Sequence, residues 1–172
     1  MNLRFIDPQE IFKQLKLKKN MTAADFGCGS GGWAMPLARK LEEGKIYAID
    51  ILEEPLSALR ARTRLEKIFN IEVIKSDIEK TSRLFPESCD LVLITNLLFE
   101  VKDKKSVLEE GKRVLKPGGK ILVVDWQEKT PLGPKEGRVS PEEVKNLAKE
   151  LNLKLEKEFE ASLYHWGLIL VK

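Results

Sequence analysis

The residues with the clearest capacity for chemistry lie in one run near the start of the chain. Residues 23–26 are mostly apolar and typical of a buried strand, and Gly27, Gly29 and Gly31 follow at every second position. Glycine has no Cβ, so a turn built from it is tight and can approach a ligand closely. The backbone N–H groups at the start of the next helix then face that ligand. The run therefore predicts a binding site for a small-molecule cofactor.

The glycine spacing alone leaves the kind of cofactor open. Gly27, Gly29 and Gly32 also satisfy G-x-G-x-x-G, the dinucleotide-binding fingerprint. Asp50 follows Gly32 by 18 residues, close to where that fingerprint places an acid for a ribose hydroxyl. The glycines do not separate a nicotinamide cofactor from S-adenosylmethionine. Asp25, two residues before the first glycine, and the motifs further along the chain separate them.

Five segments in a fixed order carry a family resemblance. They are Asp-Phe-Gly-Cys-Gly-Ser-Gly at 25–31, Tyr-Ala-Ile-Asp at 47–50, Ser-Asp-Ile at 76–78, Leu-Val-Leu-Ile-Thr-Asn at 91–96 and Val-Leu-Lys-Pro-Gly-Gly-Lys-Ile-Leu-Val-Val at 114–124. Together they resemble the class I S-adenosylmethionine-dependent methyltransferases along most of the chain. Within that superfamily the chain is most similar to the small ubiquinone/menaquinone-type subgroup, the methyltransferase domain 11-like proteins. That subgroup is chemically broad, so the resemblance defines the cofactor better than the acceptor.

The resemblance implies a site for S-adenosylmethionine. It assigns Asp50 to both ribose hydroxyls, Asp77 to the adenine amino group, and Asp25 to the glycine loop or the methionine ammonium. Cys28 lies within the loop, where we expect a small packing residue and not a nucleophile. The implied cofactor-binding residues are Asp25, Gly27, Cys28, Gly29, Gly31, Asp50, Ile51, Asp77, Ile78, Thr95 and Asn96.

Short apolar runs alternate with helical stretches, which predicts a parallel sheet flanked by helices. Strands are expected to end near residue 26 and to span 45–49, 71–75, 91–95 and 120–125, with helices at 33–41, 54–69, 104–115 and 140–151. Residues 153–159 and 164–171 form two further strands, and their short connection requires antiparallel neighbours. The resemblance implies an α/β, Rossmann-like class I methyltransferase fold. In that fold a seven-stranded, mostly parallel sheet has the order 3-2-1-4-5-7-6, its last strand antiparallel, with helices on both faces.

The acceptor side of the site follows from this topology. An antiparallel last strand begins at the edge where the fifth strand ends, so residues 164–166 are expected near Asp125 and Trp126. We hypothesise that Asp125 and His165 are catalytic and orient or deprotonate the acceptor. A base is needed only where the acceptor must lose a proton. The residues expected to bind substrate are Trp126, Arg138, Tyr164 and Trp166.

The length of the chain fits a single domain over residues 1–172. Within it, an N-terminal helix in residues 1–20, together with Phe5, is expected to cover the cofactor edge. Residues 127–139 hold two prolines and two glycines and predict a lid loop over the acceptor.

The overall composition limits the classes of partner that we expect the chain to bind. The net charge is +3, from 30 basic and 27 acidic residues, and this balance is not the clustered basic face of a nucleic-acid binder. Two cysteines favour reduced thiols in a cytoplasmic protein. No apolar run approaches the ~20 residues that span a bilayer, so we expect no membrane partner. The sequence predicts no metal site.

The leading functional hypothesis is S-adenosylmethionine-dependent methyl transfer to a small molecule. In-line transfer would take place in a water-excluded site at the C-terminal edge of the sheet. The chain is close to a bare catalytic core, with no added domain to grip a macromolecule. Methylation of a protein or an RNA is the second hypothesis. A non-catalytic cofactor-binding subunit and a nicotinamide oxidoreductase are the remaining alternatives.

Overall fold

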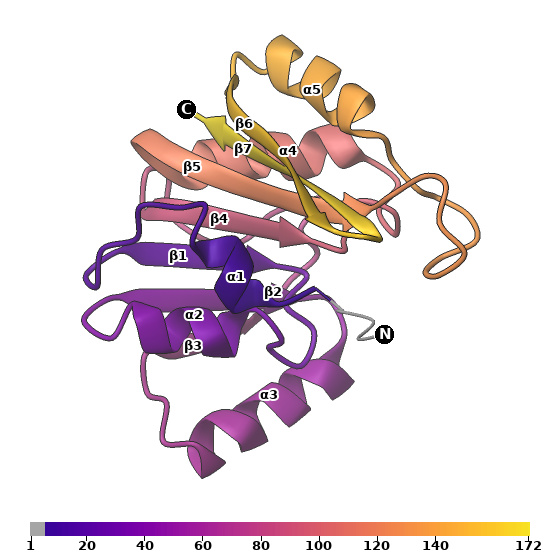
Figure 1. Ribbon diagram of the computed structural model, residues 1–172. Coiled ribbons are helices and arrows are strands. Elements are labelled where there is room, and N and C mark those ends of the chain that lie inside the picture. Colours follow the sequence, from indigo (N-terminus) through magenta and orange to yellow (C-terminus); the bar gives the residue numbers. More distant parts are fainter. Residues whose placement is uncertain (1–5) are drawn as a thin grey trace.

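Within residues 6–172, which the computed structural model describes, a seven-stranded sheet runs through the molecule with helices on both faces (Figure 1). The strands are β1 (Thr22–Phe26), β2 (Lys45–Asp50), β3 (Ile71–Lys75), β4 (Cys89–Thr95), β5 (Leu115–Trp126), β6 (Lys154–Ser162) and β7 (His165–Val171). Their order in the sheet is β3-β2-β1-β4-β5-β7-β6. β1 to β5 are parallel, and β7 is antiparallel to both of its neighbours. The expected strand order and antiparallel last strand are confirmed.

Five helices in the same described part of the chain cover this sheet. They are α1 (Pro8–Phe12), α2 (Ala34–Lys40), α3 (Glu53–Leu65), α4 (Lys104–Val114) and α5 (Pro141–Glu150). Buried side chains of α1, α2 and α3 pack on one face of the sheet, and those of α4 and α5 pack on the other. None of these helices has both the length and the apolar character needed to cross a membrane.

The two largest differences from the boundaries expected from the sequence lie at the end of α3 and at the start of β5. α3 ends at Leu65, before the expected residue 69, because Lys67 adopts a left-handed backbone with a φ of 52°. β5 begins at Leu115, before the expected residue 120, because Leu115 already pairs with Cys89. Residues 116–119 interrupt the pairing of β5 with β4, where the register shifts and Gly118 has a φ of 76°.

Side chains at the ends of β5 and β7 alternate between the two faces of the sheet. Trp126 pairs with His165, and Asp125 pairs with Trp166. Val124 belongs to the core under α1, α2 and α3, and successive side chains of a strand point to opposite faces. Trp126 and His165 therefore face the α1 side, whereas Asp125 and Trp166 face α4 and α5.

The described part of the N-terminal segment lies beside the start of α2. The ring of Phe12 in α1 meets the ring of Trp33 edge to face, with centroids 5.7 Å apart. Trp33 directly follows the glycine run, so α1 is close to the loop that follows β1. Covering of the cofactor edge by residues 1–20 stays a prediction, and Phe5 lies outside the described residues.

Candidate active site

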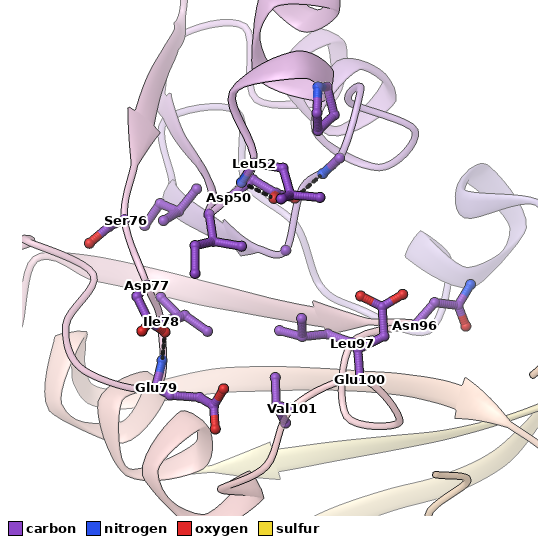
Figure 2. Close-up of a pocket in the computed structure, with 15 residues that line it drawn as sticks. Asp50, Leu52, Ser76, Asp77, Ile78, Glu79, Asn96, Leu97, Glu100 and Val101 are labelled. Atoms are coloured by element: carbon purple, nitrogen blue, oxygen red, sulfur yellow. Dashed lines mark hydrogen bonds between the residues drawn. The ribbon is translucent and has the colours of Figure 1, made fainter. Parts of the chain in front are cut away.

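A cavity of about 350 Å³ opens at the edge where β1, β2, β3 and β4 end (Figure 2). A cavity of this size suits a small-molecule ligand. Its walls come from the loop after β1 and from the segments that follow the other three strands. The expected cofactor residues that line it are Gly27, Gly29, Asp50, Ile51, Asp77, Ile78 and Asn96.

The Asp50 carboxylate lies in the upper part of the cavity in Figure 2 and bonds to two neighbouring segments. Its Oδ2 accepts the N–H of Gly29 at 2.9 Å, and its Oδ1 accepts the N–H of Leu52 at 3.0 Å. These bonds tie the end of β2 to the glycine loop and to the start of α3. A carboxylate oxygen accepts more than one hydrogen bond, so each oxygen keeps capacity for a ligand hydroxyl.

Asp77 occupies the matching position at the end of β3. Its Oδ1 accepts the N–H of Glu79 at 3.1 Å, and its Oδ2 pairs with the Lys80 ammonium at 3.0 Å. The bond from Lys80 holds the pKa of the Asp77 carboxyl below its usual range. Asp77 is therefore ionised at neutral pH and presents only acceptors to the cavity.

The glycine loop is held against β2 by its own backbone. The N–H groups of Gly27 and Cys28 both donate to the carbonyl of Ile49, at 2.8 and 3.0 Å. Gly29 and Gly31 have φ values of 52° and 87°, in the left-handed region that favours glycine. The Cys28 thiol is buried and burial raises its pKa, which fits the expected packing role.

Replacing Gly31 with alanine is expected to lower the free energy of unfolding by about 1–3 kcal/mol. The new Cβ would lie 2.4 Å from Cδ1 of Leu59, and alanine would have to adopt a φ of 87°. Gly32→Ala is the matched control, because its Cβ would meet no described atom within 4 Å and its φ is not positive. Thermal unfolding of the two variants checks this, and equal midpoints would contradict the prediction.

Asp25 lies beneath the glycine loop and does not reach the cavity surface. Its side chain is fully buried, and neither carboxyl oxygen has a hydrogen-bond partner among the described residues. Burial, followed by the nearby charge of Asp50, raises the pKa of Asp25 to about 8. At neutral pH this group is therefore mostly a neutral acid.

The other expected cofactor residues lie behind the cavity wall or turn from it. Cys28, Gly31 and Thr95 are buried and do not line the cavity. Asn96 lines it with a left-handed φ of 50°, but Figure 2 shows its amide directed away from the centre. The lining residues absent from the sequence-based set are Ile49, Leu52, Pro55, Ser76, Glu79, Leu97, Glu100 and Val101.

The structure does not bring Asp125 and His165 together as a pair. Asp125 accepts the N–H groups of Leu98 and Trp126, at 3.0 and 2.8 Å, and burial raises its pKa to about 6. His165 lies on the other face of the sheet and packs against Trp126, with ring centroids 4.1 Å apart and the ring planes tilted by 40°. Its Nδ1 bonds to the Ser162 hydroxyl at 2.9 Å, and burial lowers its pKa to about 4. His165 is thus a neutral imidazole at physiological pH.

Two of the expected substrate residues hold backbone groups instead. The indole N–H of Trp166 donates to the carbonyls of Trp126 and Val139, at 3.0 and 3.1 Å. Arg138 folds back into its own loop, and its guanidinium donates to the backbone carbonyls of Gln127, Glu128, Thr130, Leu132 and Pro134. Trp126 and Tyr164 are half-buried at the end of the β5–β7 pair, and their binding of substrate stays a prediction.

Replacing Arg138 with alanine is expected to loosen residues 127–139 while the sheet stays folded. The substitution leaves five carbonyls without their shared donor, and losing even ~1.4 kcal/mol of local stability opens the loop about tenfold more often. Thermolysin cleavage within the loop checks this, with the exposed Glu136→Ala as control. A cleavage rate equal to that of the wild type would contradict the prediction.

A family model described as a methyltransferase domain matches residues 17–166. The chain belongs to this methyltransferase family. The matched region includes every strand of the sheet up to the beginning of β7, and so contains the whole cavity.

Individual relatives agree with the family assignment. The methyltransferase resembles a solved S-adenosylmethionine-dependent methyltransferase from Aquifex aeolicus, with 30% identity and a TM-score of 0.89 over 96% of this chain and 89% of that one. Demethylmenaquinone methyltransferase of Bacillus mycoides is 29% identical over 132 residues, 76% of this chain and 55% of that protein. The enzyme of the same name from Listeria welshimeri is 31% identical over 119 residues, 68% and 50%. The chain spans about half the length of the curated relatives that it matches.

The residues of the cavity fit S-adenosylmethionine, the cofactor of this methyltransferase family. Asp50 offers a carboxylate with free acceptor capacity, which suits a ribose diol. Gly29 faces open space, since an added Cβ would meet no described atom within 4 Å. Asp77, ionised and at the end of the next strand, offers acceptors for an amino group. In the described chain, no three His, Cys, Asp or Glu side chains are grouped to hold a metal ion.

Proposed function

We propose that this methyltransferase transfers a methyl group from S-adenosylmethionine to a small-molecule acceptor. The observation that carries the proposal is the Asp50 carboxylate, held by two backbone N–H groups at the rim of a cavity of adenosine size. When bound, the cofactor supplies a methyl group activated by a positively charged sulfur. The chain then has to hold the cofactor and the acceptor, align them, and exclude water. These effects account for much of the catalysis of such a transfer.

For the acceptor we propose a planar ring compound, the class to which demethylmenaquinone, named in the curated relatives, belongs. The packed aromatic rings of Trp126 and His165 at the end of the β5–β7 pair support this, because an aromatic surface favours a flat ligand. Asn96, which lines the cavity, donates its N–H to the carbonyl of Val124, two residues before Trp126, at 2.8 Å. The role proposed for His165 is a hydrogen bond from its buried, unpartnered Nε2 to a ring oxygen, because an imidazole of pKa about 4 is a weak base.

We also propose where the protein acts and how the chain is organised. The thiols of Cys28 and Cys89 are free, which supports action in the cytoplasm. Residues 127–139 remain our candidate for a lid over the acceptor, and residues 6–172 fold around one sheet, which supports a single domain. Protein or RNA methylation is the second candidate, supported by the half-buried Trp126 at the end of β5.

The experiment incubates purified protein and methyl-labelled S-adenosylmethionine with a cell extract, which is then separated into metabolite, protein and RNA fractions. The proposal predicts label in the metabolite fraction, where the product can be identified. Label in protein or RNA supports the second candidate. Binding of the nicotinamide cofactor, but not of S-adenosylmethionine, in a parallel titration would instead support an oxidoreductase. Cofactor binding without label in any fraction would point to a non-catalytic subunit.

A further inference from the structure

Asp125 has a carboxylate that solvent does not reach and that nevertheless serves two segments of the chain. Its exposed fraction is 0%. Oδ2 accepts the N–H of Leu98 in the loop after β4, and Oδ1 accepts the N–H of Trp126 at the end of β5. Burial of a carboxylate costs free energy unless hydrogen bonds compensate it. The two bonds therefore fix the relative position of the loop and the strand end.

The loop that Asp125 holds forms one wall of the cofactor cavity. Leu97, Glu100 and Val101 in this loop line the cavity, and Figure 2 shows them opposite Asp50 and Asp77. The side chain of Leu97 also lies against the glycine loop, since a Cβ added to Gly27 would lie 2.7 Å from its Cδ1. Any displacement of the Leu98 amide therefore moves the side chain that packs on Gly27.

We propose that Asp125 is a positioning residue for the cofactor cavity and not a catalytic group. The inference rests on the proposed function, because it takes S-adenosylmethionine as the occupant of the cavity. Asp125 acts through the Leu98 amide, which places Leu97 at the distance from the glycine loop that the cofactor requires. A carboxamide at this position offers one acceptor oxygen and turns an NH₂ donor toward one of the two N–H groups. Asp125→Asn therefore leaves one buried N–H unpaired and releases the loop or the strand end.

The matched control is Asp90, which makes similar bonds at the opposite edge of the sheet. Its Oδ2 accepts the N–H of Thr22 at 2.8 Å, and its Oδ1 pairs with the Lys116 ammonium at 2.9 Å. Both residues thus join strand ends through a carboxylate, but only Asp125 contacts a wall of the cavity. Asp90→Asn measures how much folding stability is lost with such a junction while the cofactor cavity keeps its position.

The test is isothermal titration of wild type, Asp125→Asn and Asp90→Asn with S-adenosylhomocysteine. We expect Asp125→Asn to raise the dissociation constant about 3- to 10-fold, the worth of one net hydrogen bond. Asp90→Asn is expected to leave the dissociation constant unchanged. It should lower the unfolding midpoint by about as much as Asp125→Asn does. A dissociation constant for Asp125→Asn equal to that of the wild type would reduce Asp125 to a structural role and overturn the proposal.

Two further results keep the test decisive. If wild-type protein fails to bind S-adenosylhomocysteine, the proposed function is refuted and this inference with it, which differs from equal binding by wild type and variant. If Asp125→Asn does not fold, amide hydrogen exchange of the wild type replaces it. The Leu98 amide is then expected to gain protection when S-adenosylhomocysteine binds. An unchanged exchange rate at Leu98 overturns the proposal.

Discussion

Replacing Asp50 with alanine is expected to weaken the binding of S-adenosylhomocysteine by about 100-fold or more. The proposed diol contacts are two hydrogen bonds to a charged acceptor, each worth about 1.5–3 kcal/mol. The substitution also removes the acceptor for the N–H groups of Gly29 and Leu52, so the glycine loop loses one of its bonds to β2 and keeps those to the Ile49 carbonyl. Isothermal titration measures the change directly.

A ligand variant separates the two contributions of Asp50. The 2′-deoxy analogue of S-adenosylhomocysteine lacks one of the two hydroxyls, so wild-type protein should bind it more weakly than the parent compound. Asp50→Ala should bind the two compounds equally, because the group that distinguishes them is gone. If the variant still prefers the parent compound, Asp50 supports the loop but does not hold the ribose.

Replacing Asp25 with asparagine is expected to stabilise the protein in mildly alkaline solution. The carboxyl has a pKa of about 8 in the folded state against 3.8 as a model value, so between these values the folded state binds more protons than the unfolded state. Stability must then fall as the pH rises through this window. From pH 6 to pH 8 the loss is about 2 kcal/mol.

The measurement for Asp25 is the unfolding midpoint as a function of pH. In a domain of this size each kcal/mol moves the midpoint by about 2–4 °C, so the wild type should lose about 4–8 °C between pH 6 and pH 8 relative to Asp25→Asn. Asp103 is a suitable control because its pKa is lowered, mainly by its bonds with Ser106, so it stays ionised throughout. Asp103→Asn should shift the whole curve downward, whereas parallel curves for wild type and Asp25→Asn would refute the prediction.

The cofactor side of the site could be predicted from the sequence because its residues are fixed by strand ends. Gly29, Asp50 and Asp77 each follow a short apolar run, and parallel strands end at one edge of the sheet. Their convergence needs no knowledge of loop conformation. Pro55, Glu79 and Glu100 escaped prediction because they lie further from a strand end, where only the path of the loop decides what faces the cavity.

The acceptor side depended on a register that the sequence does not encode. Whether Asp125 and His165 share a face is decided by single-residue pairing, and a slip of one residue moves a side chain to the other face. Trp126 pairs with His165, and β6 and β7 pair with register shifts at two places. Likewise, no periodic pattern around Arg138 indicates that its guanidinium bonds to carbonyls of its own loop.

The hydrogen bonds from the Arg138 guanidinium to five carbonyls of its own segment hold residues 127–139 as one compact loop. Its carbonyls converge on a cation that the segment itself supplies, and it contacts the rest of the molecule at Trp126, at Val139 and through Gly137, where an added Cβ would lie 2.3 Å from the carbonyl oxygen of Phe99. The exposed side chains outside these contacts can change without disturbing the sheet. If the segment covers the acceptor, as proposed above, one part of the molecule binds the shared cofactor and residues 127–139 select the compound to be modified. Substitutions in this one surface loop would then change the acceptor without changing the cofactor site.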